Sequence, residues 1–147
     1  MDLPPEHDPL IPPSDMYFED GVPPDQFVIA GNAFLWNLLV ARTRLQPADA
    51  VLDIGSGNGK MARGLTTYLT GEGRYEGFDI MKHWVDWCSG AYANLPNFTF
   101  RHAELRSDWY APEAAVLARD YVFPYEDHTF DVAFAVSLFT HLMPEEA

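Results

Sequence analysis

The sequence contains a single cysteine, Cys88, among its 147 residues. One thiol cannot form a disulfide within the chain, and no Cys-x-x-Cys motif or neighbouring Cys/His pair is present to build a zinc site. The sequence therefore predicts no internal disulfide and no metal centre. Both absences fit a protein of a reducing compartment.

Basic residues are also scarce. Nine lysines and arginines stand against 22 aspartates and glutamates, which gives a formal net charge of −13 at pH 7. A surface this acidic repels the phosphates of nucleic acids and the headgroups of anionic lipids. We therefore expect neither a nucleic acid nor a membrane as a partner.

Long apolar runs are missing as well. No segment approaches the roughly 18 consecutive apolar residues that a membrane span requires. The opening residues, MDLPPEHDPLIPP, have neither the basic region nor the apolar region of a secretory signal. The sequence predicts a cytoplasmic protein.

What is present indicates one folded domain with an N-terminal arm. Hydrophobic residues make up 48% of the chain, and a chain of this length typically builds one core. Residues 1–26 hold seven of the twelve prolines and no lysine or arginine, which predicts an extended arm. Tyr17 and Phe18 indicate that part of this arm packs on the domain. Residues 27–147 are predicted to form that domain, beginning with an amphipathic helix over 33–45.

Beyond this first helix, short apolar runs alternate with helix-length segments. Alternation of this kind is typical of a parallel sheet built from β-α-β units. The predicted class is therefore α/β, with a Rossmann-like parallel sheet and helices on both faces. The predicted strands are 50–54, 74–79, 97–103 and 130–136, and the predicted helices are 58–69 and 81–93.

Three glycines, Gly55, Gly57 and Gly59, follow the first predicted strand. Glycine permits a positive φ and a close approach of backbone to a ligand, so such a turn forms a cradle. The plainer alternative is a tight strand-to-helix turn with no ligand. Asp53 favours the cradle, because a carboxylate inside a buried strand is costly unless partners or a ligand satisfy it.

An acidic residue, Asp79, ends the second predicted strand 20 residues after Gly59. In α/β folds a carboxylate at this place accepts hydrogen bonds from ribose hydroxyls, although it could also cap the following helix. The dinucleotide pattern G-x-G-x-x-G would need a glycine at position 60, where this chain has Lys60. Binding of a nicotinamide dinucleotide is therefore disfavoured.

Ordered motifs in residues 27–147 resemble those of the Rossmann-like, S-adenosylmethionine-dependent methyltransferases of the bacterial, small-molecule type. The motifs, in chain order, are VLDIGSGNG, YEGFDI, WVDWC, HAEL and DYVFPYEDHTFDVAFAVSLFTHLMPEE. The resemblance implies an enzyme that uses S-adenosylmethionine as its cofactor. It is specific for the superfamily and names no acceptor.

The resemblance also implies roles for individual residues. Asp79 would bind the ribose, Ile80 would flank the adenine, and Glu104 would accept from the adenine amino group. Many relatives carry an aspartate at this place, where this chain has the longer Glu104. Other residues implied to contact the cofactor lie at its methionine end or near the methyl group: Asp53, Gly55, Ser56, Gly57, Gly59, Ser137 and Leu138.

Two further features carry alternatives. His141, beyond the fourth predicted strand, is a candidate general base, and a hydrogen-bonded structural histidine is the competing interpretation. Methyl transfer often needs no base, because the sulfonium is already an activated donor. The aromatic residues within 106–125 could wall an apolar acceptor pocket, or they could pin a long loop to the domain.

The sequence thus predicts transfer of a methyl group to a small-molecule acceptor, with protein acceptors left open. An NAD(P)-linked oxidoreductase and a cofactor-binding remnant without turnover are the alternatives. The resembled enzymes have seven strands in the order 3-2-1-4-5-7-6, whereas only four are counted here. We therefore expect an incomplete catalytic domain that is poorly active alone and binds the cofactor more weakly than a full-length relative. It should either self-associate through the exposed edge of its fourth strand or have low stability.

Overall fold

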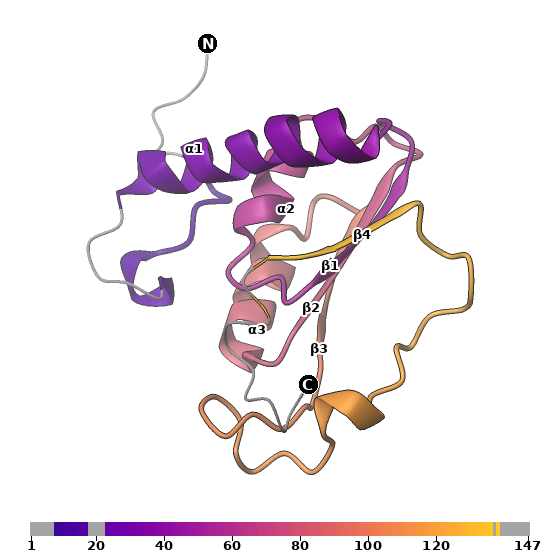
Figure 1. The fold of residues 1–147 in the computed structure, drawn as a ribbon. Helices are drawn as coiled ribbons and strands as arrows, with labels where there is room; N and C mark the ends of the chain where they lie inside the picture. Colours follow the sequence, from indigo (N-terminus) through magenta and orange to yellow (C-terminus); the bar gives the residue numbers. More distant parts are fainter. Residues whose placement is uncertain (1–7, 18–22, 137, 139–147) are drawn as a thin grey trace.

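A four-stranded parallel sheet forms the centre of the computed structural model, which describes residues 8–17, 23–136 and 138. Its strands lie in the order β3-β2-β1-β4, as Figure 1 shows. This order confirms the first four places of the predicted 3-2-1-4-5-7-6 arrangement. The strand bounds are β1 Ala50–Ile54, β2 Arg74–Asp79, β3 Phe98–His102 and β4 Val132–Ala135.

The longer helices share one face of this sheet. They are α1 (Pro24–Phe34), its π-helical continuation η3 (Leu35–Thr43), α2 (Lys60–Leu65) and α3 (Lys82–Ala91). Their apolar side chains meet those of the strands in the main core. Its most buried members are Leu35, Leu45, Val51, Ala62, Leu65, Tyr75 and Cys88.

The opposite face of the sheet is covered in a different way. Leu52, Phe78 and Ala103 form a smaller cluster there, against side chains of the long segment between β3 and β4. Within the described residues, the helical turn in that segment is the 3-10 helix η4 (Ala118–Asp120). The described residues therefore have helical structure on both faces, as predicted. Several helices cover one face, and the short turn η4 lies on the other.

The first helix begins earlier than the sequence predicted. The proline-rich pattern indicated an extended chain to residue 26 and a helix from 33, but α1 begins at Pro24. Proline is well tolerated in the first turn of a helix, because the amide it lacks would have no partner there. Its continuation η3 ends at Thr43, where the next residue, Arg44, adopts a left-handed conformation with φ of 60°.

The second helix is shorter than the predicted 58–69. It starts only at Lys60, because Gly59 has φ of 85° and cannot continue a right-handed helix backwards. At its other end, the hydroxyls of Thr66 and Thr67 donate to the carbonyls of Arg63 and Gly64. Such side-chain bonds to the backbone compete with helical hydrogen bonds and favour an end to the helix.

Strand β4 lies at one edge of the described sheet, where it pairs with β1. Val132 and Phe134 are half-buried, and the Phe134 ring lies 5.0 Å from that of Phe34, between centroids. Ala133 and Ala135 are exposed. The nearly continuous apolar run of residues 130–136 is typical of a strand covered on both faces, but among the described residues the face of Val132 and Phe134 is the more covered one.

Among the described residues, no helix combines the length and apolarity needed to cross a membrane.

Candidate functional site

The glycine turn after β1 forms the floor of the candidate site. Gly55, Gly57 and Gly59 all have positive φ, at 81°, 57° and 85°. The amides of Gly55 and Ser56 both donate to the carbonyl of Phe78 on β2, at 3.0 Å. These bonds hold the turn at the carboxyl ends of the central strands, which is where open α/β sheets bind ligands.

Asp79 links this turn to β2 through its side chain. One carboxylate oxygen accepts from the amide of Gly57 at 2.8 Å, and the other accepts from the amide of Met81 at 2.8 Å. Burial raises the pKa of Asp79, and these backbone hydrogen bonds oppose the rise. The side chain therefore bonds the backbone in two places, in the glycine turn and next to the start of α3, and its role toward a ribose stays a prediction.

Asp53 lies beneath the turn and is 1% exposed. The hydroxyl of Tyr75 donates to its Oδ2 at 2.7 Å, and the bare Cα of Gly77 leaves room for that phenol. Burial raises the pKa of Asp53 to about 7; the Tyr75 hydrogen bond opposes this rise, and the nearby Asp79 adds to it. The predicted buried carboxyl is thus real, and its partner is a tyrosine that the sequence analysis missed.

The buried carboxyl of Asp53 should make stability depend on pH. Its folded pKa of about 7 exceeds the unfolded value near 3.9, so the folded chain holds this proton more tightly. The stabilisation from the neutral carboxyl is fully present below about pH 4 and is lost as pH rises through about 7. We expect Asp53→Asn to remove a slope approaching about 1.4 kcal/mol per pH unit in the free energy of unfolding.

Urea denaturation of both chains at several pH values between 4 and 8 measures this difference. Asp15→Asn, at an exposed position, is the matched control and should keep the wild-type slope. Parallel curves for wild type and Asp53→Asn across this range would show that the Asp53 carboxyl stays ionised in the folded chain.

Two adjoining hollows open above the glycine turn. The larger, of about 650 Å³, lies between the turn, α1 and the segment at residues 8–17. The smaller, of about 290 Å³, is mostly apolar and lies against the loop between β3 and β4. The residues that line both are Gly55, Asp79, Ile80 and Leu138.

The structure brings most of the candidate residues together at these hollows. Asp53, Ser56 and Gly57 line the larger one, in addition to the four residues shared by both. The hydroxyl oxygen of Ser56 is buried and has no hydrogen-bond partner among the described residues. A Cβ at Gly57 would point into open space, with no atom within 4 Å. The site thus offers a bare backbone cradle and an unpartnered polar atom to a ligand.

Two candidates lie elsewhere. Gly59 does not line either hollow: a Cβ there would lie 3.1 Å from the sulfur of Cys88, so this glycine serves the close packing of α3. Glu104 is exposed and lines neither hollow, whereas its neighbour Leu105 lines the smaller one. Ser137 and His141 lie outside the described residues.

Further lining residues were not among the predicted cofactor contacts. They include Phe27, Met61 and Trp84 of the helices, and Tyr110, Tyr121 and Phe123 of the long loop. The density of aromatic residues within 106–125 was the one signal in the sequence for the last three. Tyr121 and Phe123 pack on Phe78 as well as lining the smaller hollow, so the loop both covers the sheet and walls a pocket.

A Rossmann-like sheet with a glycine cradle and an acidic residue at the end of β2 is the architecture of nucleoside-cofactor enzymes. Residues 52–147 match the family model described as a methyltransferase domain. Because this match covers more than half of the chain, the protein belongs to the methyltransferase domain family.

Solved structures agree on the fold. One is a provisionally assigned S-adenosyl-L-methionine-dependent methyltransferase of Methanococcus maripaludis, with a TM-score of 0.59 and 14% identity over 82% of this chain. Another is an S-adenosylmethionine-dependent methyltransferase of Aquifex aeolicus, with a TM-score of 0.54 and 16% identity over 85% of this chain. A protein-L-isoaspartate O-methyltransferase has a TM-score of 0.50 and 19% identity over 74% of the chain. The chain spans 48%, 63% and 33% of these three proteins.

Proposed function

We propose that this chain binds S-adenosylmethionine and forms the cofactor-binding part of a methyltransferase. The observation that carries the proposal is the pair of adjoining hollows at the carboxyl ends of β1, β2 and β4, with Asp53, Asp79 and Gly57 at their floor. When bound, the cofactor supplies a methyl group already activated on a sulfonium, so the protein's part is to bind and orient.

The two hollows differ in a way that matches the two ends of such a cofactor. The apolar smaller hollow, beside Ile80 and Leu105, suits the adenine. Asp79 lines both hollows, and its carboxylate, which already accepts the amides of Gly57 and Met81, has about four acceptor sites and so keeps capacity for a ribose hydroxyl. The larger hollow, with the Asp53 carboxyl beneath it, then receives the cationic methionine end.

The charge of the chain bears on the acceptor. With a net charge of −13, we propose a small, neutral or cationic acceptor rather than a nucleic acid. The isoaspartate methyltransferase shows that this fold also serves a protein-directed enzyme, so a protein acceptor is the second candidate. His141 stays a prediction for the general base.

Titration calorimetry tests the proposed cofactor directly. We expect S-adenosylmethionine and S-adenosylhomocysteine to bind at one site per chain, and NAD to bind at least about 10-fold more weakly because Lys60 replaces the third glycine of a dinucleotide loop. Tighter binding of NAD would favour the oxidoreductase alternative. Binding of the cofactor with no methyl transfer to any acceptor in a screen would favour the alternative of a cofactor-binding remnant without turnover.

The edge of β4 should promote self-association of this chain. Open backbone donors and acceptors at a sheet edge recruit other strands, and Ala133 and Ala135 give this edge no charged protection. We expect sedimentation velocity to show dimers or larger species at micromolar concentration, and Ala133→Lys to shift the distribution towards monomer. A wild-type chain that sediments as a single monomeric species would contradict this expectation.

A further inference from the structure

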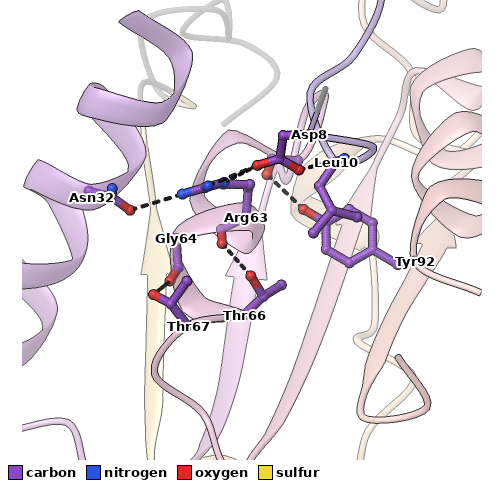
Figure 2. Close-up of polar contacts among 9 residues, drawn as sticks. Asp8, Leu10, Asn32, Arg63, Gly64, Thr66, Thr67 and Tyr92 are labelled. Atoms are coloured by element: carbon purple, nitrogen blue, oxygen red, sulfur yellow. Dashed lines mark hydrogen bonds and ion pairs between the residues drawn. The ribbon is translucent and has the colours of Figure 1, made fainter. Parts of the chain in front are cut away.

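Residues 8–17, here called the strap, cross the helical layer beside the larger hollow. At one end, the carboxylate of Asp8 accepts from Arg63 of α2, with Nη2 and Nε at 2.8 and 2.9 Å from Oδ2. The same guanidinium contacts Asn32 of α1 through Nη1, as Figure 2 shows. The Arg63 and Asp8 side chains are only 19% and 17% exposed. One half-buried cation thus joins the strap to both helices.

The other end of the strap is fixed next to the glycine turn. The side-chain amide of Asn58 donates to the carbonyl of Met16 at 3.1 Å. The ring of Tyr17 meets the ring of Phe27 edge to face, with centroids 5.8 Å apart. Contacts at both ends therefore set Tyr17 in the wall of the larger hollow.

The hydroxyl of Tyr17 has no assigned role in this arrangement. Its oxygen is buried and lacks a hydrogen-bond partner among the described residues. A buried polar group without a partner costs free energy, so its retention calls for a partner. Lys60 lines the same hollow and is the one lysine or arginine among its described lining residues.

We propose that Tyr17, with Lys60, binds the α-carboxylate at the amino-acid end of the ligand, and that the Asp8–Arg63 contact holds the strap in place for this purpose. The inference rests on the proposed function. If the inference is right, the strap forms one wall of the binding site.

Charge and position favour this end of the ligand over the others. With the ribose at Asp79 and the adenine in the smaller hollow, the remaining part of the cofactor extends past Gly57 into the larger hollow. Its carboxylate finds no positive charge at the floor, where Asp53 and Asp79 present carboxyl oxygens. Tyr17 and Lys60, which line the same hollow, offer a hydroxyl donor and an ammonium, which are the groups that bind a carboxylate.

Truncation of the ligand tests the role of Tyr17. S-adenosylhomocysteine carries the amino-acid end, whereas 5′-methylthioadenosine lacks it. We expect Tyr17→Phe to weaken binding of S-adenosylhomocysteine by about 10-fold and binding of methylthioadenosine by less than about 2-fold, because the lost hydrogen bond goes to a charged group. Equal effects on the two ligands, or no effect on either, would overturn the inference and leave the cofactor site intact.

A second experiment tests whether the Asp8–Arg63 contact, here called the latch, holds the strap in place. Asp8→Asn removes a charge that lies outside both hollows, and Asp15→Asn is its matched control at an exposed strap position. Hydrogen exchange of the ligand-free chains should show faster exchange at the amides of residues 10, 11 and 14–17 in Asp8→Asn alone. The same variant should release S-adenosylhomocysteine several-fold faster. Unchanged exchange and release in Asp8→Asn would overturn the latch.

Failure of the proposed function has a different signature. A wild-type chain that binds neither S-adenosylhomocysteine nor methylthioadenosine would overturn both the proposed function and the role of Tyr17. Binding of both ligands by wild type, with Tyr17→Phe indistinguishable from it, would overturn only the role of Tyr17.

Discussion

Gly57→Val is expected to weaken binding of S-adenosylhomocysteine by at least about 100-fold, which corresponds to about 2.7 kcal/mol. Two effects combine. Gly57 has φ of 57°, a conformation that a β-branched residue adopts only with strain. The new side chain would also point into the larger hollow, where nothing lies within 4 Å of the added Cβ, and would occupy the space meant for the ligand.

Titration calorimetry on the folded variant measures the loss of binding, and circular dichroism verifies the fold. Gly71→Val is a matched control, because a Cβ at that exposed turn also meets nothing within 4 Å but lies outside both hollows. Wild-type affinity in a folded Gly57→Val chain would remove the glycine turn from the binding site.

Gly31→Ala is expected to lower the free energy of unfolding by about 1–3 kcal/mol. Helices α1 and α2 cross so closely at this position that an added Cβ would overlap the backbone oxygen of Lys60. Gly64 makes the reciprocal approach, with its Cβ position 2.9 Å from the oxygen of Gly31. Backbone atoms on both sides leave no flexible side chain to yield, so the helices must separate.

Urea denaturation compares this variant with Gly90→Ala in α3, where an added Cβ meets nothing within 4 Å. In the Gly90→Ala control, the free energy of unfolding should rise by about 0.5–1 kcal/mol, because alanine is the better helix former. Both substitutions gain the same intrinsic propensity, so the difference between them isolates the clash at the crossing. A Gly31→Ala chain as stable as Gly90→Ala would contradict the close packing of α1 on α2.

The sequence predicted the sheet better than it predicted the helices. The bounds of β1 and β2 agree with the predicted 50–54 and 74–79, because each strand is a short apolar run that ends at a glycine turn or an acidic residue. The start of α1 was wrong, since Pro24 was interpreted as a barrier and serves instead as a first-turn residue. Within residues 8–17, 23–136 and 138, helical cover of the second face is sparse, and it depends on how the loop folds back, which no local pattern encodes.

The candidate site shows the same division. The sequence was enough to find Asp53, Gly57 and Asp79, because a charged residue within a strand and a glycine-rich turn are both local sequence patterns. Gly59 was assigned to the ligand by its motif, yet tertiary packing turns it towards Cys88 and α3. Tyr17 lies far from the glycine turn in sequence, and only the contacts of the strap bring it to the hollow.

A crystal structure of the chain with S-adenosylhomocysteine is the most direct measurement of the central claim. The account predicts density across both hollows, with the adenine beside Ile80 and Leu105, the ribose hydroxyls on Asp79, and the amino-acid end between Gly57 and the strap. Density for the ligand outside these hollows, or in the reverse orientation with the adenine beside the strap, would contradict it.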